Sequence, residues 1–192
     1  IGTGLVGSEM CIRDRIGCGH MGSSLMSGWS NSKNYTISVI DKKKYAILKK
    51  RNRNKKIKFF KSIDDINNQN NFDYIIFATR PLELRNVFKE LKNANFNKKS
   101  IAISVIAGKK TEIFKKNLIN ISKIVRVMPN MPALIGDGVH CIYTNKSINK
   151  KEIKEIDKLF SLSGKTLFFN RETFIDKACL LYTSDAADDR DS

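Results

Sequence analysis

The stretch from Val125 to Gly138 reads VRVMPNMPALIGDG and holds the pattern that decides the fold. The stretch begins within an apolar run, Ile124 to Met128. Pro129 and Pro132 follow this run, with Asn130 between them. Proline has a fixed φ angle and no backbone N–H, so this pair cannot lie inside a helix or a central strand. The sequence therefore predicts a buried strand that ends in a rigid, irregular loop. In open α/β folds, ligands bind at such loops on the carboxyl edge of the sheet.

A second signal lies near the N-terminus, where residues 17–22 read GCGHMG. Apolar residues at helical spacing follow, which predicts a helix from about Met21 to Trp29, and then a β-branched strand from Thr36 to Ile40. In this context the glycines allow a tight turn, close approach of backbone amides to a pyrophosphate, and close packing of helix on strand. The helix N-terminus would face the phosphates. The predicted cofactor-binding residues of this loop are Gly17, Cys18, Gly19, His20, Met21 and Gly22.

Asp41 comes directly after the predicted strand that follows the glycine loop. A carboxylate there can accept hydrogen bonds from both ribose hydroxyls, which favours NADH. It would repel the 2′-phosphate of NADPH unless Lys42, Lys43 or Lys44 offsets its charge. A carboxylate after a strand also caps turns. The sequence leaves these three roles of Asp41 open.

The rest of the chain, to about residue 170, alternates between strand and helix patterns. We expect strands at 57–60, 74–78, 100–105, 124–128, 138–143 and 165–169, and helices at 83–91 and 150–160. This alternation predicts a Rossmann-type, doubly wound α/β fold with a mainly parallel sheet.

Three of these strand ends resemble motifs of the pyrroline-5-carboxylate reductase family. VRVMPNMPALIGDG resembles the segment that ends the family's dinucleotide-binding domain, Ala78–Pro81 its Ala-Val-Lys-Pro, and Ile106–Gly108 its Ala-Ala-Gly beside the nicotinamide. Arg80 replaces the lysine, which keeps the charge and changes the geometry. The resemblance implies that the cofactor contacts Ala78, Thr79, Arg80, Pro81, Ile106, Ala107 and Gly108. It places Asn130 near the substrate.

The resemblance covers residues 16–178 and implies hydride transfer from NADPH (or NADH) to the C=N carbon of 1-pyrroline-5-carboxylate, which gives L-proline. Family members usually prefer NADPH. Their substrate is held by an all-α C-terminal domain that also builds the dimer, and we expect this chain to be truncated before it. Residues 16–170 would then be the dinucleotide-binding domain and residues 171–178 the start of the helical one. We expect an inactive fragment, a homo-oligomer only at full length, and no catalytic residue that the sequence identifies.

Two other classes remain open at this stage. An NAD(P)-dependent reductase of the β-hydroxyacid dehydrogenase or deazaflavin-dependent kind would share the glycine loop, but should lack the loop from Met128 to Pro132. A non-catalytic dinucleotide-binding or nucleic-acid-binding module would explain the large positive net charge of the chain. It would leave the three strand-end motifs unexplained.

Composition narrows the classes further. The 192 residues carry a formal net charge of +16, but the lysines are spread among asparagines without interleaved aromatic residues, which does not indicate a nucleic-acid partner. No apolar run approaches the roughly 20 residues of a membrane span. The four cysteines form no Cys-x-x-Cys pair and the two histidines have no metal-ligand spacing. We expect reduced thiols in a cytoplasmic protein and no metal site.

Both ends of the chain break the strand–helix pattern. Residues 6–15 read VGSEMCIRDR and residues 179–192 read CLLYTSDAADDRDS, and both resemble translated sequencing-adapter read-through. A dinucleotide fold needs an apolar first strand before its glycine loop, and Arg13, Asp14 and Arg15 would be costly to bury there. We therefore expect residues 1–15 and 179–192 to be non-native flanks outside the fold.

Overall fold

A computed structural model describes residues 10–16, 20–30, 32, 35–51, 54–55, 57–66, 72–94, 96–129 and 138–178, with the backbone alone at 10–16, 20, 21, 23, 24 and 51. The strands are β1 (Met10–Ile16), β2 (Tyr35–Ile40), β3 (Ile57–Phe60), β4 (Tyr74–Ala78), β5 (Ile101–Ser104), β6 (Lys123–Pro129), β7 (Gly138–Thr144) and β8 (Gly164–Phe169). The helices are α1 (His20–Ser30), α2 (Tyr45–Arg51), α3 (Leu84–Glu90), α4 (Thr111–Asn117) and α5 (Lys150–Phe160), and residues 173–178 are also helical. Within these ranges, no helix has the length and apolar character needed to cross a membrane.

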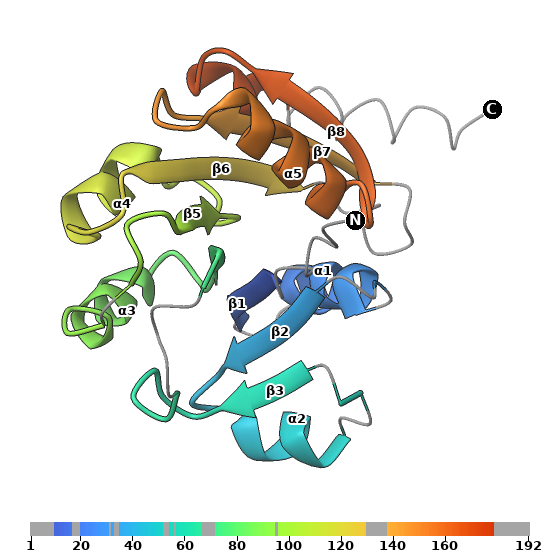
Figure 1. Ribbon diagram of the computed structural model, residues 1–192, viewed down its shortest axis with the longest axis vertical. Helices are drawn as coiled ribbons and strands as arrows, with labels where there is room; N and C mark the ends of the chain where they lie inside the picture. Colours follow the sequence, from blue (N-terminus) through green and yellow to red (C-terminus); the bar gives the residue numbers. More distant parts are fainter. Residues whose placement is uncertain are drawn as a thin grey trace, which may run out of the picture.

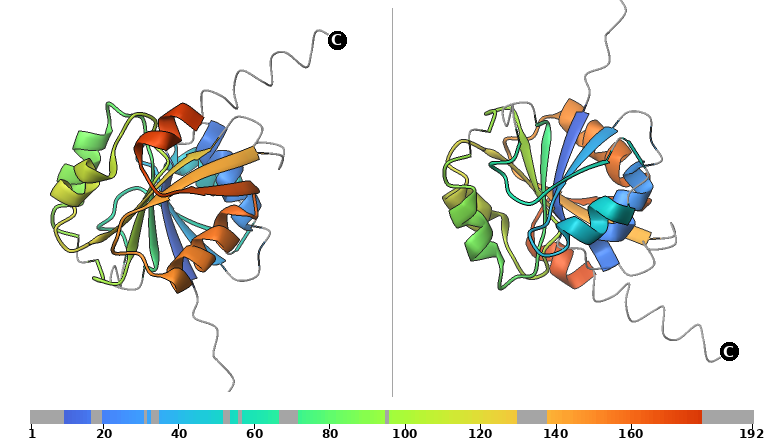
Figure 2. Two further views of the ribbon diagram at one scale, coloured as in Figure 1. Left: turned by 90° about the horizontal axis from the view of Figure 1, so that it is seen from above. Right: turned by 90° about the horizontal axis from the view of Figure 1, so that it is seen from below.

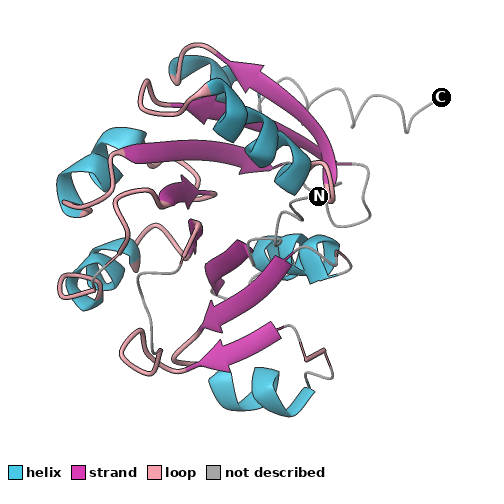
Figure 3. Cartoon of the chain, viewed as in Figure 1, coloured by secondary structure: helices cyan, strands magenta, loops and turns pink. Residues whose placement is uncertain are grey.

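The eight strands of the described residues form one sheet in the order β3-β2-β1-β4-β5-β6-β7-β8 (Figures 1 and 3). The five strands β3, β2, β1, β4 and β5 and the adjoining β6 are parallel to one another, β7 is antiparallel to β6, and β8 is parallel to β7. The predicted Rossmann-type, mainly parallel α/β fold is confirmed. The strand order reverses direction between β1 and β4, and in such sheets ligands bind in the crevice outside the carboxyl ends of the strands at that point.

Helices cover both faces of the sheet (Figure 2). On one face, Leu25 and Trp29 of α1 and Phe160 of α5 belong to one apolar core with the inward side chains of the strands. Trp29 joins the two helices, because its Nε1 donates a hydrogen bond to the carbonyl of Leu159 at 2.9 Å. On the other face, α3 and α4 pack over a second core. There Phe114 stacks edge-on against two phenylalanine rings of β4 and α3. A doubly wound sheet buries both faces in this way, which fixes its strand ends relative to one another.

The position of residues 10–15 corrects the sequence prediction that they lie outside the fold. They form most of β1, a central strand that pairs with β2 on one side and β4 on the other. The physical reason is that both neighbours need a hydrogen-bonded strand between them, whatever side chains it carries. That residues 1–15 are non-native stays a prediction, as does the same assignment for residues 179–192, which lie outside the described ranges.

The buried strand predicted at Ile124–Met128 is confirmed as β6, which extends to Pro129. Pro129 is the last residue of this strand and lies opposite His140 of β7 in the antiparallel pair. The predicted loop around Pro132, residues 130–137, lies outside the described part of the chain. The other predicted strands and helices are found within one or two residues of their expected ends.

Candidate functional site

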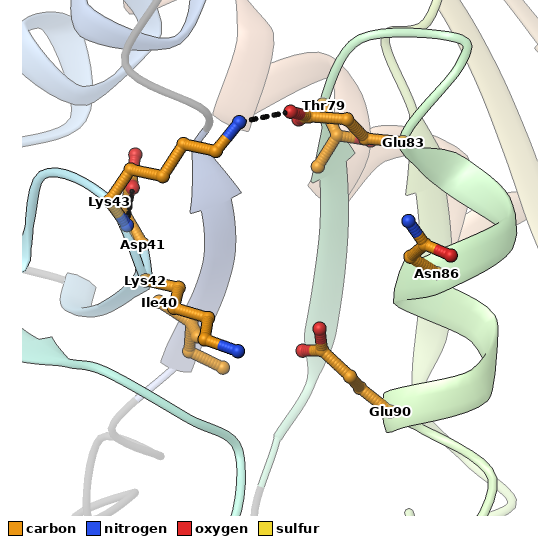
Figure 4. A pocket seen from close by; sticks show the side chains of 8 residues that line it. All are labelled: Ile40, Asp41, Lys42, Lys43, Thr79, Glu83, Asn86 and Glu90. Atoms are coloured by element: carbon orange, nitrogen blue, oxygen red, sulfur yellow. Dashed lines mark hydrogen bonds and ion pairs between the residues drawn. The ribbon is translucent and has the colours of Figure 1, made fainter.

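A pocket of about 240 Å³ lies at the carboxyl ends of β2 and β4, on either side of the end of β1 (Figure 4). We call it the switch-point pocket. It contains two of the predicted cofactor residues, Asp41 after β2 and Thr79 after β4. The described residues that line it are Ile40, Asp41, Lys42, Lys43, Thr79, Glu83, Asn86 and Glu90. The fold therefore brings together two residues that the sequence assigned separately to a dinucleotide.

Asp41 holds the turn between β2 and α2. Its Oδ1 accepts hydrogen bonds from the backbone N–H groups of Lys43 at 3.0 Å and Lys44 at 2.8 Å, and its side chain is largely buried. Its backbone carbonyl accepts from the N–H of Tyr45, the first residue of α2. Of the three roles that the sequence left open, the structure shows the turn-capping one. Contact with a ribose stays a prediction, and the pocket position agrees with it.

Lys43 and Glu83 form an ion pair between the β2–α2 turn and the start of α3, with Nζ 2.9 Å from Oε1 (Figure 4). The side chains are 80% and 39% exposed. Exposed pairs of this kind contribute about 0.2–1 kcal/mol, so a ligand can compete for either partner. This ion pair is a property of the site that the sequence did not reveal.

Three pocket residues on or beside α3 were also missed by the sequence analysis: Glu83, Asn86 and Glu90. They recur at i, i+3 and i+7, so they share one face of the helix, while Leu84 and Val87 are buried on the other. This polar spacing was the available signal.

Thr79 is the buried member of the motif Ala78–Pro81. Its side chain is 7% exposed, and its Oγ1 has no hydrogen-bond partner among the described residues. A buried hydroxyl without a partner is rare, because it loses its hydrogen bonds to water. Arg80 and Pro81, in contrast, are exposed. The polar atom of Thr79 at the strand end is therefore available to a ligand in this pocket.

The turn Ile106–Gly108 follows β5, the neighbour of β4. Ile106 is buried, Ala107 and Gly108 are exposed, and Gly108 has a φ of 67°. A Cβ added at Gly108 would meet no atom within 4 Å. The glycine is therefore required by the left-handed backbone in the described structure, rather than by crowding. Contact of this turn with a nicotinamide stays a prediction.

The glycine loop is only partly described. Gly17, Cys18 and Gly19 lie outside the described residues, as does Asn130. His20 and Met21 open α1, and Gly22 is buried in its first turn. The helix thus begins close to the carboxyl end of β1, as the pattern predicts. The cofactor roles of these residues remain predictions.

An ion-pair network around the buried Arg126 ties the segment after β8 to the sheet. Arg126 of β6 is 1% exposed, and its Nη1 and Nη2 donate to the two carboxylate oxygens of Asp176 at 3.2 and 2.5 Å. Nη1 also lies 3.6 Å from Oε1 of Glu172. Glu172 in turn accepts hydrogen bonds from the backbone N–H and the hydroxyl of Thr111, at the start of α4. This network links β6, α4 and the helical residues 173–178, and nothing in the sequence analysis predicted it.

A second buried polar group, His140 of β7, forms a hydrogen bond within the protein core. Its Nε2 lies 2.9 Å from the Ser163 hydroxyl, which donates to the carbonyl of Phe160 at 3.1 Å. Since that hydroxyl has one proton, Nε2–H is the donor and Nδ1 is unprotonated. Burial lowers the pKa of His140 to about 4, so the ring is neutral at pH 7.

The chain is similar to known NAD(P)-dependent oxidoreductases. A family described as NADP oxidoreductase coenzyme F420-dependent matches residues 15–108. The chain is 30% identical over 121 residues to a pyrroline-5-carboxylate reductase of Haemophilus influenzae, covering 60% of this chain and 44% of that protein. It is 34% identical over 106 residues to one of Aquifex aeolicus, covering 55% and 38%.

A solved pyrroline carboxylate reductase of Plasmodium falciparum with NADP bound shares the fold, with a TM-score of 0.63 and 22% identity, covering 84% of this chain and 57% of that one. The chain thus spans less than half of the length of the two curated relatives. The resemblance to the pyrroline-5-carboxylate reductases that the sequence motifs indicated is confirmed.

Proposed function

We propose that this chain is the dinucleotide-binding part of a pyrroline-5-carboxylate reductase. The reaction would be hydride transfer from NAD(P)H to the C=N carbon of 1-pyrroline-5-carboxylate, which gives L-proline. One observation carries the proposal: Asp41 and Thr79, which motifs far apart in the sequence assigned to the cofactor, line one pocket at the switch point of the sheet. The curated relatives with this name support the choice of reaction.

The described residues fit a dinucleotide. Thr79 presents a buried hydroxyl without a partner, and Asp41 holds a turn whose side chains reach the same pocket. The bound cofactor would supply the hydride, and the residues of this chain would bind and orient it. A protonated imine is already electrophilic, so positioning the two rings accounts for most of the catalysis.

The first test concerns Gly19. We expect Gly19→Val to remove NAD(P)H binding and to leave the fold intact, because a branched side chain fills the space through which backbone amides reach a pyrophosphate. Calorimetric titration of NADPH and NADH into the parent chain and the variant, with circular dichroism as the check on folding, measures this. Equal affinity of the Gly19 variant and the parent would refute the glycine-loop assignment.

A second test concerns activity. In the family that the motifs resemble, the imine is held by a helical domain, and we propose that residues 1–192 alone do not catalyse the reaction at a useful rate. Loss of substrate orientation can raise a barrier by roughly 7–11 kcal/mol. A proline auxotroph should grow with a gene in which residues 16–178 continue into such a domain, and should fail to grow with residues 1–192. Growth with the short chain would instead place the substrate site within it, around Asn130.

A second candidate is a deazaflavin-dependent NADP oxidoreductase, which the family match over residues 15–108 favours. That match ends before the Pro129–Pro132 segment, whose sequence resembles the proline-forming enzymes. In our proposal the protein acts on a small imine, and its partners include neither nucleic acid nor a membrane. Reduction of a deazaflavin by NADPH, with no oxidation of NADPH by the imine in the longer gene product, would decide for the second candidate.

A further inference from the structure

The charges around the switch-point pocket differ from those that a 2′-phosphate requires. The described residues of its lining include two lysines, Lys42 and Lys43, and three carboxylates, Asp41, Glu83 and Glu90, so these side chains together carry one net negative charge. The phosphate that distinguishes NADPH from NADH adds close to two further negative charges at pH 7. A ribose 2′-hydroxyl, in contrast, donates hydrogen bonds to carboxylates. The composition of the lining thus favours the hydroxyl.

One of the two pocket lysines, Lys43, already faces a carboxylate. Nζ of Lys43 lies 2.9 Å from Oε1 of Glu83, and Figure 4 shows this side chain reaching across the pocket from the β2–α2 turn toward the start of α3. A 2′-phosphate beside Asp41 would have to compete with Glu83 for that ammonium group. It would also bring its own charge close to both carboxylates.

The backbone that carries Lys43 is held in place. Asp41 accepts the N–H groups of Lys43 and Lys44, and the N–H of Asp41 itself donates to the carbonyl of Phe60 on β3. Glu83 precedes α3 without a side-chain capping bond. Substitution of Glu83 therefore changes the charge of the pocket and leaves the helix start intact.

We infer that this pocket selects the dinucleotide with a free 2′-hydroxyl, NADH over NADPH, and that the Lys43–Glu83 ion pair enforces the selection. The inference rests on the proposed function, since it concerns the same cofactor site. It assigns Glu83 as a specificity-determining residue. Neutralising Glu83 releases Lys43 toward a 2′-phosphate and removes one repulsive charge, so it should shift the preference toward NADPH.

The test compares the dissociation constants of NADH and NADPH for chain 1–192, by nicotinamide fluorescence at low ionic strength, where exposed charges are least screened. The parent chain should bind NADH more tightly. Glu83→Gln should tighten NADPH binding about three- to tenfold and change NADH binding less than about twofold. Lys43→Gln should bind NADPH more weakly than the parent chain does. Glu112→Gln is the matched control, because it also neutralises the carboxylate of an exposed ion pair. Oε1 of Glu112 lies 2.8 Å from Nζ of Lys116 on α4.

Tighter binding of NADPH than NADH by the parent would overturn the selection. An NADPH response of Glu83→Gln that equals the Glu112→Gln response would overturn the role of the ion pair. Both results leave the proposed function standing, because a dinucleotide still binds. Binding of neither dinucleotide by the parent would overturn the proposed function itself, and this inference with it.

Discussion

Loss of both carboxylates around Arg126 should destabilise the protein by about 3 kcal/mol, at the lower end of the range for a broken buried ion pair. The guanidinium is 1% exposed, so Glu172→Gln with Asp176→Asn leaves its charge buried without a counter-ion. The lower end applies because Asp176 is 47% exposed and is partly solvated already. Urea unfolding, followed by circular dichroism, gives the change in unfolding free energy.

A third substitution separates charge from packing. With Arg126→Met added, no unpaired charge remains, and the triple variant should recover most of the loss, since apolar replacements of buried ion pairs are often neutral. Glu112→Gln, which breaks an exposed pair on α4, should change the unfolding free energy by less than about 1 kcal/mol. A double variant no less stable than Glu112→Gln would contradict the assigned role of the network.

Apolar residues in β1 should raise the melting temperature. Residues 13 and 14 are in register with Ser38 and Val39 of β2 and with Ile75 and Ile76 of β4, all of which are buried. A strand at this central position is ordinarily apolar, and charges there cost several kcal/mol to bury. We expect the combined change Arg13→Ile, Asp14→Val and Arg15→Ile to raise the melting temperature by about 5–10 °C.

The measurement is differential scanning calorimetry of the parent and the variant. Lys115→Ile on the exposed side of α4 serves as the control, since it adds one apolar residue without changing the sheet. A lower melting temperature of the β1 variant would mean that the charged strand is suited to its place. The prediction that residues 1–15 are non-native would then be wrong.

The parts of the fold with a strong local pattern could be predicted from the sequence. Helix α5 has the expected bounds, because its apolar residues share one face and Asn149 and Glu152 form a capping box at its start. Strand β6 could be predicted because proline marks its end. The doubly wound order could be predicted from the alternation of strands and helices. The position of residues 10–15 in β1 could not, since their charges contradict the pattern of a buried strand.

The missed parts of the site depend on long-range contacts. Arg126 stands between two valines in an apparently apolar strand, and its partner Asp176 is 50 positions further along the chain. Glu83, Asn86 and Glu90 look like ordinary polar residues of a surface helix until the fold places α3 beside the β2–α2 turn. Asp41 and Thr79 could be predicted because each directly follows an apolar strand, and the parallel sheet brings such positions to one edge.

The hydrogen bond between Trp29 and Leu159 also gives the protein an optical reporter. Trp29 is the single tryptophan of the chain, it is 0% exposed, and it lies on the helix that follows the glycine loop. Its emission therefore reports the docking of α1 on α5 from one known position. Because the reduced nicotinamide ring of NADH or NADPH absorbs where tryptophan emits, excitation energy can pass from this indole to a reduced cofactor at the proposed site near the start of α1. Unfolding and cofactor binding can thus be followed through one native fluorophore, without a label.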